Sequence, residues 1–246
     1  MKSLEKQGLE FKLSHKVVAT KSGSKDVEVT MESEQDKKQV KDKFNVVLMS
    51  IGRKPNTEEL NLKKMSIKSD NQGRIQVDNK FQTSIKNIYA IGDVIKGPML
   101  AHKAEEEGIA VAEIIAGQSG HVNYNIIPGV IYTSPEVASV GKTEQQLIKE
   151  NIKYKIGKFP FMANSRAKVI NEIEGFVKIL AEEKTDKLLG VHIIGPHAGD
   201  MIAEMVLAME FGASSEDIAR TCHAHPTYSE AIKEAALAVD KRPIHY

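Results

Sequence analysis

The sequence predicts a mixed fold, in which an α/β portion is followed by an α+β unit. Two observations carry this prediction. In the first half, short apolar runs of strand length end at glycines, as at residues 44–51 and 88–91. In the second half, a pair of strand-like segments, 175–181 and 187–195, precedes a helical segment at 200–211.

The composition is that of a globular protein of one or two domains. The 246 residues are 41% hydrophobic and 27% charged, with a formal net charge of +1. We therefore expect neither nucleic acid nor a membrane as partner, since no basic excess and no apolar run of roughly 18 residues is present. Cys222 is the one cysteine, which rules out an intrachain disulfide and fits a reducing compartment. We expect the cytoplasm, or the mitochondrial matrix in a eukaryote.

Residues 1–52 are expected to form a small β-rich part. Val27, Val29 and Met31 alternate with polar residues, which is the period of a half-buried strand. The apolar run 44–51 predicts a fully buried strand, and Gly52 then permits a tight exit from it. The predicted elements are a helix-like stretch at 1–8, strands at 11–19, 27–31 and 44–51, and a polar turn at 32–43.

Residues 53–122 are expected to contain strands at 73–78 and 88–91 and a helix from about 99 to 116. The second strand ends in Gly92 and Asp93. A glycine lets a ligand approach the backbone, and an aspartate there can accept hydrogen bonds from sugar hydroxyls. Alternatively, Asp93 is a turn residue that caps the next segment. The acidic residues at 105–107 suit the start of a helix and need no further role.

Residues 123–246 are expected to form the α+β unit. Ile202, Met205, Val206 and Met209 would lie on one face of the last long helix, as a core stripe or a dimer contact. The predicted strands are at 126–132, 154–161, 175–181 and 187–195, and residues 134–138 lead into a further strand that ends at Gly141. The other predicted elements are a helix beginning at Thr143, a helix at 200–211, a loop at 164–167 and a helix after Pro226.

The segment before that last helix holds two histidines, His223 and His225. Pro226 pushes His225 out of the helical region, and Thr227 and Glu230 have the spacing of a capping box. A histidine beside a carboxylate is a good layout for a general base and its orienting partner. Alternatively, Glu230 only caps the helix and His225 is a loop histidine. His223 is expected to be a loop histidine without a role.

The pattern His-Ala-His-Pro-Thr-x-Ser-Glu resembles the C-terminal active-site segment of the dihydrolipoamide dehydrogenase family of flavoprotein disulfide oxidoreductases. Two further stretches carry the resemblance, at 50–56 (Ser-Ile-Gly-Arg-Lys-Pro-Asn) and at 83–93. It implies that His225 accepts protons from substrate thiols, that Glu230 holds it, and that a cis bond precedes Pro226.

The resemblance also implies FAD and NAD as cofactors. Gly52 would lie against the NAD, and Asp93 would bind the ribityl chain of FAD. For His102 the alternative is an ordinary first-turn side chain. The residues that would line the flavin are Met99, Leu100, Ala101 and His102.

By the same resemblance, the chain would be organised as remnants of two Rossmann-like dinucleotide-binding domains followed by an α+β interface domain. Residues 1–52 would end the NAD domain, 53–122 would complete the FAD domain, and 123–246 would form the interface of a homodimer. The implied reaction oxidises dihydrolipoamide on the lipoyl domain of a 2-oxo acid dehydrogenase or glycine-cleavage complex. Electrons would pass through a redox disulfide and FAD to NAD.

Two family features are missing from the sequence. It has no C-x4-C pair, and no two of its 17 glycines are spaced as G-x-G. We therefore expect a fragment that holds no flavin alone. The alternatives are an inactive dimerisation module, a glutathione reductase-like enzyme, or one chain of a two-chain enzyme. The histidine spacings match no zinc pattern, so we expect no metal site.

Overall fold

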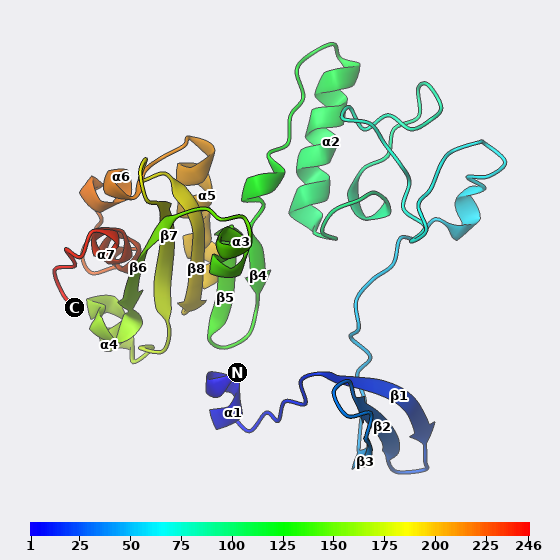
Figure 1. The fold of residues 1–246 in the computed structure, drawn as a ribbon, viewed down its shortest axis with the longest axis horizontal. Helices are drawn as coiled ribbons and strands as arrows, with labels where there is room; N and C mark the ends of the chain where they lie inside the picture. The colour runs from blue at the N-terminus through cyan, green and yellow to red at the C-terminus, as the bar shows by residue number, and fades with distance from the viewer. The chain divides into compact units, whose positions relative to one another are not determined.

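The computed structural model describes all residues, 1–246, and separates them into two compact units, Met1–Met99 and Leu100–Tyr246. Figure 1 traces the first unit from blue to blue-green and the second from green to red. The mixed fold class predicted from the sequence is confirmed, with one sheet in each unit. None of the helices combines the length and the apolar character that a membrane crossing requires.

The first unit contains an antiparallel sheet in the order β1-β2-β3. The alternation at 27–31 correctly predicted its central strand, in which Val29 and Met31 are buried. The strand predicted at 11–19 begins later. The elements are α1 (Lys2–Lys6), β1 (His15–Ser22), β2 (Val27–Ser33) and β3 (Gln39–Phe44).

The polar turn predicted at 32–43 is wrong, because its second half pairs with β2 as strand β3. Opposite charges across the pair stabilise this polar strand. Lys41 Nζ lies 3.1 Å from Glu28 Oε1, and Lys43 Nζ lies 3.3 Å from Asp26 Oδ2. Polar composition alone therefore did not distinguish an exposed strand from a turn.

The buried strand predicted at 44–51 is also wrong. Strand β3 ends at Phe44, and the apolar residues after it form no strand; Leu48 is 86% exposed and Ile51 is 89% exposed. A strand buried on both faces requires a sheet around it. The sheet of this unit consists of β1, β2 and β3, so this run has no strand beside it.

Residues 53–99 are held by turns rather than by strands. The strands predicted at 73–78 and 88–91 are reduced to isolated bridges, Ser69 to Ile75 and Gln82 to Tyr89. Asp78 Oδ1 accepts backbone N–H groups from residues two and four positions on, which favours turns over a ladder. The short helices here are η1 (Glu58–Leu60) and η2 (Gly92–Val94).

The second unit is built on an antiparallel sheet in the order β4-β5-β8-β7-β6. The predicted pairing of 175–181 with 187–195 is confirmed, with Ile179 opposite Val191. The strand predicted at 126–132 is shorter than expected. The strands are β4 (Gly129–Ile131), β5 (Glu136–Gly141), β6 (Tyr154–Pro160), β7 (Phe176–Glu182) and β8 (Leu188–Gly195).

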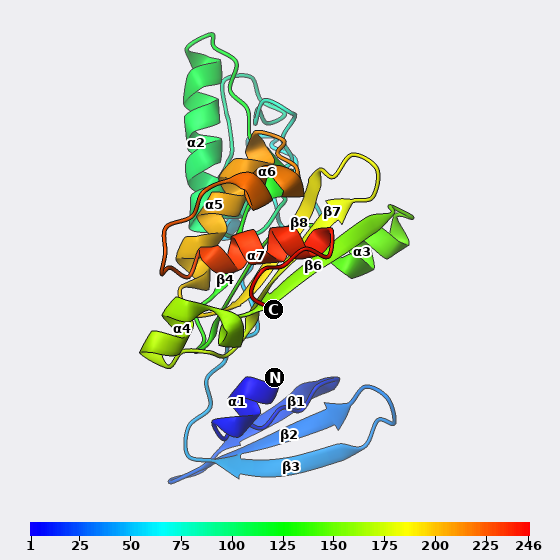
Figure 2. The same cartoon turned by 90° about the vertical axis from the view of Figure 1, so that its left-hand side faces the viewer.

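Helices α5, α6 and α7 cover one face of this sheet and form the core with it (Figure 2). Helix α3 lies on the other face, where Lys178 of β7 donates to Glu144. The helices are α2 (Ala101–Ile115), α3 (Glu144–Lys149), α4 (Ser165–Ile170), α5 (Ala198–Glu210), α6 (Ser215–Arg220) and α7 (Glu230–Val239), with η3 (Tyr124–Ile126) and η4 (Phe161–Ala163).

Two of these helices differ from the sequence prediction. The loop predicted at 164–167 is the start of α4, because the Asn164 side chain accepts the Ala167 N–H at 2.9 Å and caps it. Helix α6 was not predicted. Its start carries a reciprocal capping box between Ser214 and Asp217, which is a local signal visible in the sequence.

Helix α7 lies close against strand β6 because Gly157 carries no side chain. A Cβ atom at Gly157 would overlap the carbonyl oxygen of Ala235 and would lie 2.6 Å from the backbone nitrogen of Val239. Both neighbours are backbone atoms of α7, and they cannot rotate away as the end of a flexible side chain could. The glycine therefore sets the distance between α7 and the sheet.

Replacing Gly157 with alanine should lower the free energy of unfolding by about 1–3 kcal/mol, because the added methyl group forces α7 away from the sheet. Urea denaturation followed by circular dichroism measures this. The matched control is Gly129→Ala, whose Cβ would meet Ser139 Oγ at 3.9 Å, an ordinary contact. Equal stabilities of the two variants would contradict the prediction.

Candidate active site

The segment between α6 and α7 is fixed by hydrogen bonds at both its backbone and its side chains. The peptide bond between His225 and Pro226 is cis, as the family resemblance implied. The Thr227 hydroxyl donates to the Ala224 carbonyl at 2.7 Å, and Asn164 Nδ2 donates to the Thr227 carbonyl at 2.9 Å. These contacts hold the turn in which His225 lies.

His225 and Glu230 are brought together as predicted. His225 Nδ1 lies 2.8 Å from Glu230 Oε1, and Glu230 Oε2 accepts the Thr227 N–H at 2.8 Å. A carboxylate only accepts, so Nδ1 carries the hydrogen and Nε2 keeps its lone pair in the neutral ring. The His225 side chain is 67% exposed, whereas that of Glu230 is 20% exposed. The pair therefore presents an oriented imidazole to its surroundings.

The capping box predicted at Thr227 is half correct. Glu230 reaches back to the Thr227 N–H, but α7 begins at Glu230 itself, with Ser229 as N-cap. The Thr227 hydroxyl donates to Ala224 instead of accepting from the helix. The predicted cap residue therefore belongs to the turn before the helix. Glu230 in the first turn is also favoured by the helix dipole.

His223 has a structural role that the sequence prediction missed. Its Nε2 lies 2.8 Å from Glu204 Oε1 of α5, and its Nδ1 lies 3.0 Å from the Thr221 carbonyl oxygen. The hydrogen bond to Glu204 raises the pKa of His223 above its usual value, in spite of partial burial. Glu204 lies 19 residues away, so no local spacing in the sequence could indicate it.

A second missed feature is a buried ion pair at the start of α2. Lys103 Nζ lies 2.9 Å from Glu107 Oε1, with both side chains fully buried, and the Tyr124 hydroxyl donates to Glu107 at 2.7 Å. Glu107 therefore has a structural role, and the expectation that the acidic run 105–107 needs no function stays a prediction. Burial raises the pKa of the Tyr124 hydroxyl, and the hydrogen bond to the negatively charged Glu107 raises it further. The i,i+4 spacing of Lys103 and Glu107 was the available signal.

The predicted cofactor residues fall into both units. In the first unit, Gly52 adopts φ +109° and has open space where a side chain would be. Asp93 lies in η2, and its Oδ2 atom is 2.7 Å from Arg53 Nη2. Met99 is half-buried at the end of this unit.

In the second unit, the other predicted residues form the start of α2. Leu100 is its extended N-cap, and Ala101 and His102 are exposed in the first turn. His102 Nε2 lies 2.9 Å from the Pro128 carbonyl oxygen, which can only accept, so the ring donates through Nε2. His102 thus ties α2 to the chain just before β4.

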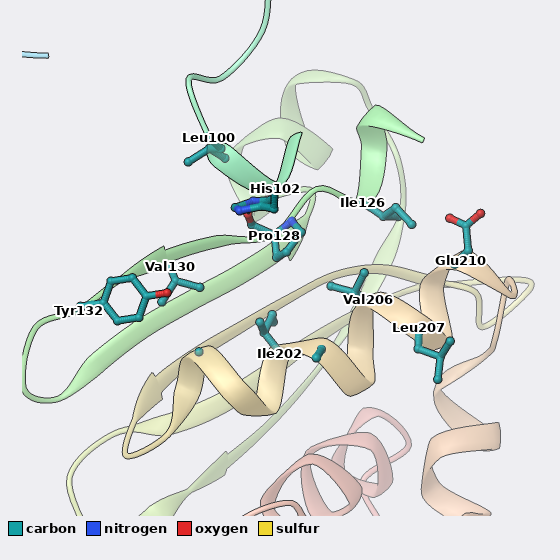
Figure 3. A pocket seen from close by; sticks show the side chains of 12 residues that line it. Leu100, His102, Ile126, Pro128, Val130, Tyr132, Ile202, Val206, Leu207 and Glu210 are labelled. Carbon is teal, nitrogen blue, oxygen red and sulfur yellow. The ribbon is translucent and has the colours of Figure 1, made fainter. Parts of the chain in front are cut away.

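An apolar groove of about 630 Å³ lies between α5 and the chain leading into β4. Figure 3 shows Ile202 and Val206 of α5 on one side and Val130 and Tyr132 on the other. Tyr132 is 82% exposed at one end of the groove. A groove of this kind on a folded surface indicates a site of association. We call it the α5 groove; its remaining lining residues are Leu100, His102, Ile126, Pro128, Gly199, Ala203, Leu207 and Glu210.

Two profiles of one protein family match the chain. The profile described as "Pyridine nucleotide-disulphide oxidoreductase" matches residues 1–108. The profile described as "Pyridine nucleotide-disulphide oxidoreductase, dimerisation domain" matches residues 127–236. Together they account for most of both units.

Individual proteins are also similar. The mitochondrial dihydrolipoyl dehydrogenase of Pisum sativum is 57% identical over 99% of this chain and 49% of its own length. A leghemoglobin reductase of Glycine max is 55% identical over 98% of this chain and 46% of its own length. The crystal structure of LpdA from Mycobacterium tuberculosis superposes with a TM-score of 0.85 at 26% identity, covering 96% of this chain and 50% of LpdA. The chain spans about half the length of the curated relatives it matches.

Replacing Glu230 with alanine should lower the free energy of unfolding by about 1–2 kcal/mol, because the Thr227 N–H and the His225 ring lose their acceptor. Chemical denaturation of the purified chain measures the loss. Ser229→Ala is the matched control, since Ser229 is the N-cap but makes no side-chain cap hydrogen bond. The role given to the carboxylate is refuted if both variants unfold alike.

Proposed function

We propose, since the chain belongs to the pyridine nucleotide-disulphide oxidoreductase family, that it serves as the C-terminal half of a dihydrolipoyl dehydrogenase. The observation that carries this proposal is the His225–Glu230 pair, with Nδ1 and Oε1 2.8 Å apart. The relative from Pisum sativum, at 57% identity, supports the same activity. The proposed reaction oxidises dihydrolipoamide with NAD through FAD and a redox disulfide.

In this reaction His225 acts as the general base. Its Nδ1–H donates to Glu230, so its Nε2 lone pair is the atom that takes the proton from a substrate thiol. Removing that proton produces the thiolate, which is the nucleophile in thiol–disulfide exchange. Glu230 fixes the tautomer and stabilises the positive charge that the ring gains. A base of this kind contributes about two to four orders of magnitude in rate.

The redox disulfide that the reaction needs must lie outside residues 1–246. Cys222 is the only cysteine in the sequence, and it is exposed. One thiol cannot form and break an internal disulfide. We therefore infer that a second polypeptide region, carrying the cysteine pair and the glycine-rich loops, completes the enzyme.

FAD and NAD are the cofactors that the proposal requires. Gly52, with an open backbone in the left-handed region, suits close approach by NAD. Asp93 keeps acceptor capacity beyond its bond to Arg53, which suits the hydroxyls of the ribityl chain. When bound, FAD accepts the electrons of the dithiol and NAD takes them onward. The residues proposed to line the flavin stay Met99, Leu100, Ala101 and His102.

A homodimer is part of the proposal. The dimerisation profile covers residues 127–236, and the α5 groove within that range is apolar and open. A second copy of the chain would cover Tyr132 and Leu207, which are largely exposed. The predicted stripe of α5 serves both purposes. Ile202 and Met205 are buried in the core, and Val206 and Met209 are partly buried against it. Ile202 and Val206 also line the groove.

The remaining parts of the proposal follow from the reaction. The partner is a lipoyl domain of a 2-oxo acid dehydrogenase or glycine-cleavage complex, and the compartment is the cytoplasm or, as the relative from Pisum sativum suggests, the mitochondrion. The proposed domains stay 1–52, 53–122 and 123–246. A glutathione reductase-like activity is the chemical alternative, and the relatives that are dehydrogenases disfavour it.

The second candidate function is a dimerisation module without catalysis. The single cysteine favours it, as does the fact that the sheet of the second unit is complete whereas 46–51 has no strand beside it. Both candidates share the same dimer. They differ in whether the chain gains activity when the missing half is supplied.

The deciding experiment supplies that half. The chain is purified alone, and also after co-expression with the N-terminal half of the Pisum sativum relative, then incubated with FAD and desalted. We expect no visible flavin absorption from the chain alone. With the partner half, we expect a flavin band and NAD reduction that depends on dihydrolipoamide. A retained flavin band in the chain alone refutes the need for a second half, and no activity in either sample favours the dimerisation module.

Replacing His225 with glutamine in the reconstituted enzyme should lower the rate about 10²- to 10⁴-fold, because the base is lost. The flavin band and the dimer should persist. His245→Gln is the matched control, since His245 forms a similar pair with Glu234 of α7 at 2.7 Å. An unchanged rate in His225→Gln with full flavin content would remove His225 from the mechanism.

A further inference from the structure

His223 is buried where His225 is exposed, although the two are neighbours in one short segment. The His223 side chain is 5% exposed. Both of its ring nitrogens face groups that only accept hydrogen bonds, the Glu204 carboxylate and the Thr221 carbonyl. A neutral imidazole has one N–H and cannot satisfy both. The arrangement is therefore that of an imidazolium that donates twice.

The charged groups around the ring support this state. Glu204 approaches from α5, and Lys233 approaches from α7, where its Nζ donates to the Thr221 carbonyl at 2.8 Å. Lys233 disfavours a second positive charge, but the hydrogen bond from the ring to Glu204 outweighs it and raises the pKa of His223. The same carbonyl of Thr221 thus receives hydrogen bonds from both His223 and Lys233.

These contacts anchor the chain on the upstream side of His225. Downstream, the turn is held by Glu230 on the Thr227 N–H and by Asn164 on the Thr227 carbonyl. Cys222 and His225 itself are exposed between the two sets of anchors. The orientation of the His225 ring therefore depends on where both sets place the backbone.

We propose that His223 is a positioning residue for His225. As an imidazolium joined to Glu204 of α5 and to the Thr221 carbonyl, it holds the backbone of residues 222–225 so that His225 Nδ1 stays on Glu230. The proposal deepens the proposed function and rests on it, because it assigns importance to the ring of His225. It also links α5, which lines the α5 groove, to the segment that carries the base.

The test reads the two rings directly, in the full chain and without cofactor or substrate. Long-range ¹H–¹⁵N spectra distinguish a doubly protonated ring, an Nδ1–H tautomer and an Nε2–H tautomer. At pH 7 we expect His223 to be doubly protonated and neutral His225 to be the Nδ1–H tautomer. His225→Gln and His223→Leu assign the signals.

His223→Leu should shift neutral His225 toward a mixture of both tautomers. It should also speed hydrogen exchange of the Thr227 N–H, which donates to Glu230 Oε2, at least about tenfold, because the upstream anchor is lost. Glu204→Gln keeps an acceptor but removes the charge, so it should give a smaller change and serves if His223→Leu does not fold. His245→Leu is the matched control and should alter neither signal. A merely structural residue would change stability without moving the His225 tautomer.

The pH dependence gives a second readout. A pKa raised in the folded state contributes stability that is present below the unfolded value of about 6.5 and is lost as the pH rises through the folded-state value. Protection of the Thr227 N–H, corrected for intrinsic exchange, should therefore fall as the pH rises above about 6.5. In His223→Leu this dependence should disappear.

An unchanged His225 tautomer and unchanged exchange in a folded His223→Leu variant would overturn the proposal, as would a neutral His223 at pH 7. This failure is separable from failure of the proposed function. If the reconstituted enzyme lacks activity but the tautomer still depends on His223, the positioning role stands and the assigned reaction fails. If activity is present and the tautomer ignores His223, the positioning role alone fails.

Discussion

The packing of α7 onto the sheet of the second unit is the constraint on which the candidate site depends. Ile232, Ala235 and Val239 are buried against strands β6 and β7, and each large apolar side chain buried in this way stabilises by about 1.5–3 kcal/mol. Gly157 permits the close approach. Because Glu230 is the first residue of α7, the helix places the carboxylate, and the carboxylate places the imidazole of His225.

Histidine–carboxylate pairs recur in this unit, and burial separates their roles. His223 is enclosed between α5 and its own segment, with acceptors on both nitrogens, so its proton is held. His225 donates a hydrogen bond from Nδ1 to Glu230, and the rest of its ring is exposed, so Nε2 is free to exchange a proton with its surroundings. His245 bonds to Glu234 and fastens the end of the chain to α7. Only an exposed and oriented ring suits proton transfer.

Local signals in the sequence predicted the second unit well and the first unit poorly. Two strand-like segments joined by a short polar turn predicted the β7–β8 pair, and the His-x-His-Pro pattern with a glutamate predicted the His225–Glu230 pair, because each signal acts over a few residues. The run 44–51 was predicted wrongly, since burial depends on neighbouring strands that composition does not reveal. Glu204 was missed because it meets His223 only after α5 packs on the sheet.

The exposed apolar run at 46–51 has a consequence for how the chain must be handled in a cell. Its six residues, Val-Val-Leu-Met-Ser-Ile, carry no charge and no proline, which is the composition of segments that zip into intermolecular sheets. Two processes then compete for this exposed run: self-association with other copies of the chain, and pairing with a complementary strand. The solubility of the chain then depends on how much of that complementary strand, or of a chaperone, is available. The amount of the chain must therefore match the amount of the partner that covers this run.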